Sequence, residues 1–198
     1  MIDDTSNGYE AVADAFVAAR SGSTTGLAII RQWAASLPAG GTVIDIGCGS
    51  GEPVTAALLD AGLTVSALDA SPALVEAFRR RFPDVEVACE PAERSRFFGR
   101  RFDGAVAVGL MFLLPEHAQR TLIGNVAGAL KPGGRFLFTA PRQVCAWDDV
   151  LTGRRSASLG AEEYVRILDE AGLHLVAEHV DEGENHYFEA RKRAARSG

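Results

Sequence analysis

Short apolar runs alternate along the chain with longer stretches of helical spacing. These short, strand-like runs predict strands at 42–46, 64–68, 85–89, 102–108 and 134–140. Between them, apolar residues three and four positions apart predict helices at 53–61, 72–82 and 116–130. Because strands alternate with helices and the strand runs are apolar throughout, we expect right-handed crossovers and a mostly parallel sheet covered on both faces.

The pattern changes after the fifth strand. A polar segment without a clear period, 141–159, leads to a predicted helix at 160–171. Two further strand-like runs, 173–180 and 185–191, flank the turn "DEGE" and predict an antiparallel hairpin. Two helices are predicted ahead of the first strand, at 8–20 and 24–36. The fold class is therefore α/β, a single domain over 1–198 with a doubly wound, seven-stranded, mostly parallel sheet and a terminal antiparallel hairpin.

Local signals mark the helix ends. Ser71 is expected to cap the helix at 72–82, with Pro72 at its first position. The run "LKPGG" at 130–134 predicts the end of one helix and a turn into the fifth strand.

The composition and net charge argue against nucleic acid and membrane as partners. The 198 residues are 47% hydrophobic and 23% charged, which is typical of one soluble domain. The net charge of −6 argues against a nucleic-acid surface. The one basic cluster, "RKRAARSG" at 191–198, lies at the end of the chain, where we expect 192–198 to be a disordered tail. No apolar run approaches the roughly 18 residues of a membrane span, and the acidic N-terminus is unlike a signal peptide.

The cysteines indicate the compartment. The chain has three, Cys48, Cys89 and Cys145, widely separated and without metal-ligand spacing. An odd number without a disulfide framework is typical of a reducing cytoplasm. We therefore expect a cytoplasmic protein with no metal site, no membrane partner and no nucleic-acid partner. The sequence does not predict the oligomeric state.

A glycine-rich turn follows the first strand in "VIDIGCGSGE", residues 43–52. Gly47, Gly49 and Gly51 permit positive φ and leave the backbone bare for a ligand at the start of the next helix. Their G-x-G-x-G spacing differs from the G-x-G-x-x-G of dinucleotide folds. The carboxylates of Asp45 and Glu52 would repel phosphates. The turn thus favours a nucleoside with a positive end and no phosphate, such as S-adenosylmethionine.

An acidic residue ends the second strand. Asp69, in "SALDAS", lies 18 residues after Gly51, where a carboxylate can accept hydrogen bonds from both ribose hydroxyls. The alternative is a turn aspartate that caps the next helix, a role that Ser71 already provides.

These motifs resemble those of class I S-adenosylmethionine-dependent methyltransferases. "VIDIGCGSG" resembles the family's first motif and "LDAS" its second. "FDGAVAVGLMFLL" (102–114) is similar to the fourth-strand block, and "ALKPGGRFLFTAP" (129–141) to the fifth-strand block. The resemblance implies a Rossmann-like methyltransferase fold, with the cofactor lying across the C-terminal ends of the first four strands.

The resemblance also implies which residues bind the cofactor: Asp45, Gly47, Cys48, Gly49, Gly51, Asp69, Ala70 and Gly109. After the third strand, many members have Gly-Asp-Ala-Glu where this chain has "CEPAERSRF". Alignment on "AE" assigns the adenine contacts to Ala92 and Glu93, whereas alignment on the strand end assigns them to Glu90. The leading helices, 1–40, are expected to cover the cofactor. There Arg20 either pairs with the methionine carboxylate or is solvated.

The acceptor site is expected among the loops at the same edge of the sheet. In "GLMFLLP", Met111 and Phe112 either line a pocket for a hydrophobic small molecule or pack under the next helix. Tyr9 is a further substrate candidate. The segment 141–159 is predicted to be a substrate lid, with Trp147 facing the substrate and 152–156 mobile; the alternative is a surface crossover whose tryptophan packs on the sheet.

Catalysis by such an enzyme rests mainly on positioning the acceptor for in-line displacement. A general base is needed only if the acceptor must lose a proton. His186 and Tyr187, at the start of the last strand, are the candidates, although a hairpin histidine is often only structural.

The sequence therefore predicts an S-adenosylmethionine-dependent methyltransferase that acts on a small-molecule acceptor. Two alternatives stay open: a methyltransferase of protein or RNA, and a nucleotide-binding module without transferase activity. The identity of the acceptor and the methylated atom are not predicted.

Overall fold

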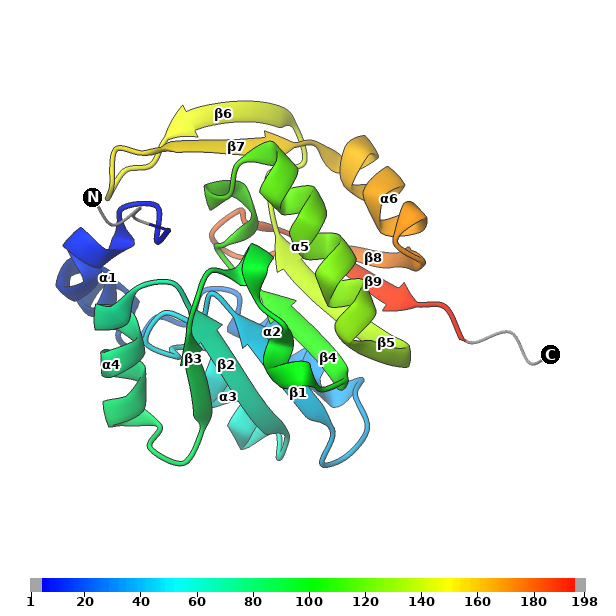
Figure 1. The fold of residues 1–198 in the computed structure, drawn as a ribbon, viewed down its shortest axis with the longest axis horizontal. Coiled ribbons are helices and arrows are strands. Elements are labelled where there is room, and N and C mark those ends of the chain that lie inside the picture. Colours follow the sequence, from blue (N-terminus) through cyan, green and yellow to red (C-terminus); the bar gives the residue numbers. More distant parts are fainter. Residues whose placement is uncertain (1–4, 195–198) are drawn as a thin grey trace.

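The computed structural model describes residues 5–194 and contains a central twisted sheet between two layers of helices (Figure 1). Within that range the sheet has seven strands in the order β3-β2-β1-β4-β5-β9-β8. Neighbours among the first five strands pair in parallel, and β9 pairs antiparallel with both β5 and β8. This confirms the predicted fold class. The strands are β1 Thr42–Ile46, β2 Thr64–Asp69, β3 Glu86–Cys89, β4 Phe102–Ala107, β5 Leu130–Thr139, β8 Leu173–Val180 and β9 His186–Lys192.

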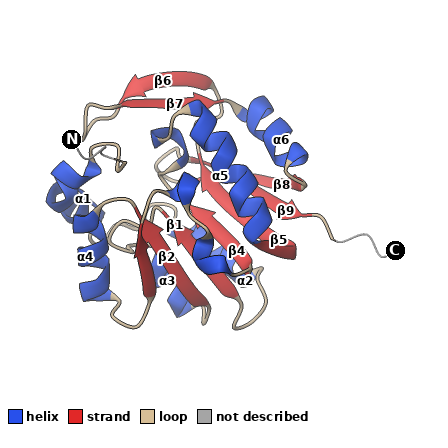
Figure 2. Ribbon diagram, in the orientation of Figure 1, coloured by secondary structure: helices blue, strands red, loops and turns tan. Residues whose placement is uncertain are grey.

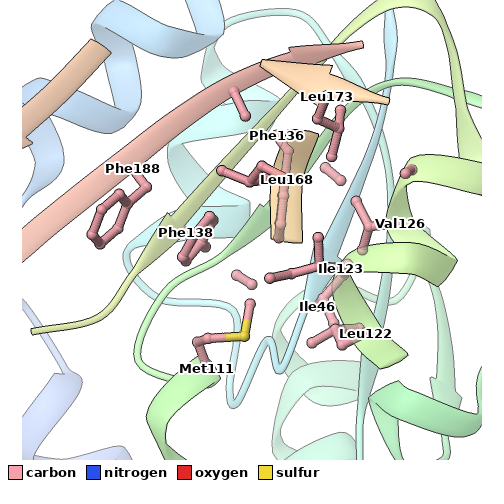
Figure 3. Packing of buried hydrophobic residues seen from close by; sticks show 14 of the residues in the cluster. Ile46, Met111, Leu122, Ile123, Val126, Phe136, Phe138, Leu168, Leu173 and Phe188 are labelled. Carbon is pink, nitrogen blue, oxygen red and sulfur yellow. The ribbon is translucent and has the colours of Figure 1, made fainter. Parts of the chain in front are cut away.

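The two helical layers bury opposite faces of the sheet. On one face lie α2 (Leu27–Ala35), α3 (Val54–Asp60) and α4 (Pro72–Arg81). On the other lie α5 (Glu116–Ala129) and α6 (Ala161–Glu170), in front of the sheet in Figure 1. The larger core cluster lies under α5 and α6, where Phe136, Phe138 and Phe188 pack against Ile123 and Leu168 (Figure 3). Because both faces are covered, the strands are apolar on both sides, as the sequence indicated.

The expected signals at the helix ends are present, with one difference. The hydroxyl of Ser71 accepts a hydrogen bond from the amide of Leu74 at 3.2 Å, so Ser71 caps α4 as predicted. At "LKPGG", α5 ends at Ala129, but β5 begins at once at Leu130 rather than at residue 134. The proline and glycines lie in an irregular part of the strand, where the register with β4 shifts.

The segment 141–159, for which no period was expected, forms a separate two-stranded antiparallel sheet. Its strands are β6 (Val144–Asp148) and β7 (Arg155–Leu159). Figure 2 shows this hairpin above the C-terminal end of the main sheet, with its turn next to the N-terminal segment. Gly153, with φ of +64°, lies in the turn. The mobility of 152–156 stays a prediction.

The ends of the chain also differ from expectation. The leading helix is a 3-10 helix, Tyr9–Val12, that continues into α1 (Ala13–Arg20). Of the predicted tail, residues 195–198 lie outside the described residues. Lys192 belongs to β9 and donates hydrogen bonds to the carbonyl oxygens of Ala127 and Leu130, at 2.6 and 2.8 Å. None of the helices within 5–194 has the length and apolar character needed to span a membrane.

Candidate functional site

A cavity of about 680 Å³ lies at the C-terminal ends of β1, β2 and β4. The floor consists of residues that follow the three strands, and residues 5–20 cover it. We call it the glycine-turn cavity; its lining includes Asn7, Tyr9, Phe16, Arg20, Gly47, Gly49, Asp69, Ala70, Ala92, Glu93 and Gly109.

The glycine turn presents bare backbone to this cavity. Gly47 and Gly49 have φ of +72° and +56°. A Cβ atom on Gly49 would lie 2.7 Å from the Phe16 ring, so no larger residue fits beneath the N-terminal helix. Gly51 does not line the cavity: its Cβ would meet Phe82 at 2.4 Å, because it packs against α4.

Asp69 is held in one orientation at the cavity wall. Its Oδ2 accepts a hydrogen bond from the amide of Gly49 and its Oδ1 from the amide of Ser71, both at 2.9 Å. Burial raises the pKa of this carboxyl, while the amide hydrogen bonds oppose that rise. An ionised carboxylate accepts about four hydrogen bonds, so two sites are left for a ligand.

The other carboxylates near the turn do not reach the cavity. Asp45 is 1% exposed and accepts a hydrogen bond from the hydroxyl of Thr55 at 2.6 Å. Burial raises its pKa to about 7. Glu52 forms an ion pair with Arg81, and Cys48 is buried against α4. Of the three carboxylates Asp45, Glu52 and Asp69, only Asp69 therefore lines the cavity, in contrast to the expectation that Asp45 and Glu52 face the ligand.

The two alignments after β3 lead to different places. Ala92 and Glu93 line the glycine-turn cavity. Glu90 does not line it, because its side chain turns back to accept a hydrogen bond from Ser95 Oγ at 2.6 Å. The alignment on "AE" thus agrees with the position of the cavity.

Two donors in this cavity have no partner. Nε of Arg20 and Nδ2 of Asn7 are buried and make no hydrogen bond within the described part of the chain. A buried donor without a partner costs about 1–3 kcal/mol. Both side chains therefore fit a ligand with acceptor oxygens, such as a carboxylate. Sequence reasoning identified Arg20 but missed Asn7, which only its turn context, "SNG", would have indicated.

A second cavity of about 750 Å³ adjoins the first. The two share Tyr9, Phe16, Arg20, Val108 and Gly109, so we call the second the central cavity. Polar groups from the sheet edge lie on its far wall. Tyr187 donates its hydroxyl proton to Asp181 Oδ2 at 3.0 Å, and Thr139 Oγ1 accepts from the amide of Gly109 at 2.7 Å.

The third cavity, of about 770 Å³, lies beside β6, and we call it the hairpin cavity. It shares Phe112, Thr139 and Asn185 with the central cavity. The rings of Phe112 and Trp147 are 5.3 Å apart at 46° on its wall. Met111, the other residue expected here, is fully buried in the core and lines none of the three cavities.

The two catalytic candidates point in opposite directions. His186 and Tyr187 are consecutive residues of β9, and successive strand residues face opposite sides of a sheet. Tyr187 lines the central cavity, whereas His186 lines the hairpin cavity. The two candidates for a general base therefore face different cavities. Asp181, Asn185 and Thr139, which line the same cavities, were missed because each is typical of an ordinary turn or strand end.

Comparison with known proteins places this site in context. A family model described as "Methyltransferase domain" matches residues 43–134. No curated protein matched the chain. Among solved structures, the CcbJ methyltransferase from Streptomyces caelestis is 17% identical with a TM-score of 0.78, and the alignment covers 96% of this chain and 98% of that one.

Two further structures were solved with bound ligands. Burkholderia thailandensis 1,6-didemethyltoxoflavin-N1-methyltransferase, with bound 1,6-didemethyltoxoflavin and S-adenosylhomocysteine, is 21% identical (TM-score 0.72, coverage 95% and 90%). The glycopeptide N-methyltransferase MtfA, complexed with sinefungin, is also 21% identical (TM-score 0.69, coverage 84% and 94%). At these identities the likeness shows the fold.

Proposed function

We propose that this chain, which carries a class I S-adenosylmethionine-dependent methyltransferase domain, transfers the methyl group of S-adenosylmethionine to a small-molecule acceptor. The proposal rests on one observation. The glycine-turn cavity contains buried donors at Arg20 and Asn7 that have no partner among residues 5–194, and it continues into the central cavity. A cofactor site that opens directly onto a second cavity is the arrangement that a group transfer between two small molecules needs.

The residues of the glycine-turn cavity fit S-adenosylmethionine group by group. Asp69 has two free acceptor sites for the ribose hydroxyls. Arg20 and Asn7 supply donors for the methionine carboxylate. Ala92 and Glu93 lie where the adenine is expected, and among the described residues that line the cavity Arg20 is the only cation that would favour phosphate. When bound, the cofactor supplies a methyl group on a sulfonium, a leaving group that needs no metal or protein nucleophile.

The acceptor is proposed to lie in the central and hairpin cavities. Their residues come from the N-terminal segment, β5, β9 and the β6–β7 hairpin, so a small molecule bound there would contact all of these elements. The solved relatives named for toxoflavin and glycopeptide substrates support the same class of acceptor. The protein's contribution to the rate is positioning of the acceptor for in-line displacement. The composition and the unpaired cysteines support a cytoplasmic location.

Calorimetry with S-adenosylhomocysteine tests the proposal, with NAD as the comparison ligand. We expect S-adenosylhomocysteine to bind and to raise the melting temperature. At a concentration of 100 times its Kd the gain in stability is about 2.7 kcal/mol. Stabilisation by NAD without stabilisation by S-adenosylhomocysteine would overturn the proposal and favour a dinucleotide-binding module.

A further inference from the structure

The hairpin cavity has an aromatic wall that belongs to two separate elements. Phe112 lies in a 3-10 helix after β4, and Trp147 lies on β6. Their rings are in contact, and both are half-buried. Pro141 and Val180 add apolar surface to the same cavity. Aromatic rings gain most from contact with another ring, stacked or edge-on. The wall therefore suits a planar aromatic group.

A histidine and a carboxylate form a pair on the other side of this cavity. His186 Nε2 lies 2.7 Å from Oε2 of Glu178, and the same oxygen accepts a hydrogen bond from Arg142 Nε at 3.1 Å. Partial burial acts to raise the pKa of Glu178, but the hydrogen bonds from Arg142 and His186 outweigh it and lower the pKa. Glu178 is therefore an acceptor, and the proton of this contact belongs to Nε2 of His186.

With its proton on Nε2, the imidazole has a lone pair on Nδ1. Within residues 5–194, Nδ1 makes no hydrogen bond. The ring is held in place by an edge contact with Phe188, with centroids 4.8 Å apart. The backbone carbonyl oxygen of His186 accepts a hydrogen bond from Ala140 at 3.1 Å. A carboxylate that fixes the tautomer of a histidine and leaves its other nitrogen basic is the arrangement of a general base.

We infer that His186, oriented by Glu178, accepts the proton of an acceptor whose nucleophile is an O–H or N–H group on a planar aromatic ring bound against Phe112 and Trp147. This inference rests on the proposed function. The acceptor's lone pair forms the new bond to the methyl carbon, and the electron pair of the carbon–sulfur bond stays on sulfur. The acceptor's proton passes to Nδ1 of His186, which becomes an imidazolium. The product is a neutral methylated ring.

The charges around His186 fit this role. Glu178 on β8 and Arg142 after β5 neutralise each other, and Glu184 in the β8–β9 turn adds a negative charge to the cavity. The other elements packed against the cavity contribute Phe112 and Trp147, which are uncharged. The imidazolium formed during transfer is therefore compensated. An aromatic O–H has a pKa near that of tyrosine, about 10, and holds its proton at neutral pH, which is why a base is needed.

The experiment starts from the protein saturated with S-adenosylhomocysteine. Three planar probes, 2-naphthol, 8-hydroxyquinoline and benzimidazole, are titrated against tryptophan fluorescence, with cyclohexylamine as the non-aromatic comparison. Trp147→Phe removes the reporting side chain, while Trp33 stays buried in the core. We expect a planar probe to quench the wild-type signal, and not that of Trp147→Phe.

Probes that bind are then assayed for methylation with S-adenosylmethionine in wild type, His186→Gln and Glu178→Gln. We expect His186→Gln to lower kcat at least 100-fold, since a general base contributes about 10²–10⁴-fold, and Glu178→Gln to lower it about 10-fold. KM and the affinity for S-adenosylhomocysteine should stay near wild type. His174→Gln, an exposed histidine on β8, is the matched control and should change nothing.

The outcomes separate the two proposals. If S-adenosylhomocysteine does not bind, the proposed function fails and this inference fails with it. If it binds but no planar probe quenches Trp147, or none that quenches is methylated, the inference alone is overturned. Wild-type turnover by His186→Gln would likewise overturn the assignment of the base.

Discussion

The hydroxyl of Tyr9 donates a hydrogen bond to Oδ2 of Asp149, 3.1 Å away, and so joins the N-terminal segment to the β6–β7 turn, 140 residues further along the chain. The next residue of this segment, Glu10, makes hydrogen bonds on the opposite side, to α4. Glu10 Oε2 accepts hydrogen bonds from Ser71 Oγ at 2.5 Å and from the amide of Ala73 at 3.0 Å, at the start of α4. The segment that covers the glycine-turn cavity is thus fixed at both edges. A ligand that leaves the cavity past this segment must therefore break one of these contacts.

Tyr9→Phe removes the first of these contacts and keeps the ring. A hydrogen bond to a charged acceptor is worth about 1.5–3 kcal/mol when buried and less when partly exposed. We expect S-adenosylhomocysteine to dissociate about 3–10-fold faster, as measured by stopped-flow, with a melting temperature close to wild type. Asp149→Asn should also accelerate release. An unchanged dissociation rate in both variants would mean that the ligand leaves by another route.

Asp69→Asn tests the ribose contact. An asparagine has one acceptor oxygen where the aspartate uses two, for the amides of Gly49 and Ser71. One amide would therefore face an NH₂ group, and we expect a loss of about 1–3 kcal/mol in stability as well as weaker binding of S-adenosylhomocysteine. Calorimetry and chemical denaturation measure the two effects. Asp60→Asn, an exposed residue at the end of α3, is the control. Unchanged affinity in Asp69→Asn would show that the ribose is bound elsewhere.

Much of the glycine-turn cavity was predictable because strand ends are visible in the sequence. Gly47, Asp69 and Gly109 each follow an apolar run directly, and the C-terminal ends of parallel strands meet at one edge of the sheet. Spacing does not tell which side of a turn a residue faces. The sequence therefore did not indicate that Gly51 packs against α4 or that Asp45 lies behind the turn, although both residues belong to the same motif.

The acceptor side was less predictable. The hairpin β6–β7 carries small and polar residues on its buried side, among them Ser158, which donates a hydrogen bond to the carbonyl of Pro141 at 2.6 Å. Without an apolar alternation, the sequence has no strand signal there. The partner of His186, Glu178, comes from the neighbouring strand, and this pairing depends on register that a single sequence does not contain.

The pKa of Asp45 predicts how stability depends on pH. Burial raises this pKa from 3.8 to about 7, so between these values the folded state holds a proton that the unfolded state has lost. The contribution of the protonated Asp45 carboxyl to the stability of the folded state is therefore fully present below about pH 4, and it is lost as the pH rises to about 7. Asp45→Asn removes this titration. From pH 5 to pH 8, we expect the stability of wild type relative to Asp45→Asn to fall by about 2–3 kcal/mol, at 1.36 kcal/mol per pH unit.

Urea denaturation of both proteins at the two pH values measures this difference. Any constant cost of burying the amide cancels in the comparison, because it is the same at pH 5 and pH 8. Thr55→Val, which removes the hydrogen bond to Asp45 but keeps the carboxyl group, should retain the pH dependence. A stability difference that is equal at both pH values would contradict the raised pKa.

Trp147→Ala decides between a pocket wall and a packing residue. In the structure Trp147 is half-buried, and its ring contacts Phe112 in the hairpin cavity. Trp33, by contrast, belongs to α2 and is 2% exposed in the core. Truncation of a fully buried tryptophan costs about 3–5 kcal/mol, so Trp33→Ala should show that loss in denaturation and Trp147→Ala a clearly smaller one. Since Trp147 lines neither the glycine-turn cavity nor the central cavity, the affinity for S-adenosylhomocysteine should not change, while the KM of a planar acceptor should rise at least 10-fold. A loss of stability equal to that of Trp33→Ala, or an unchanged KM in a stable variant, would place the acceptor away from the hairpin.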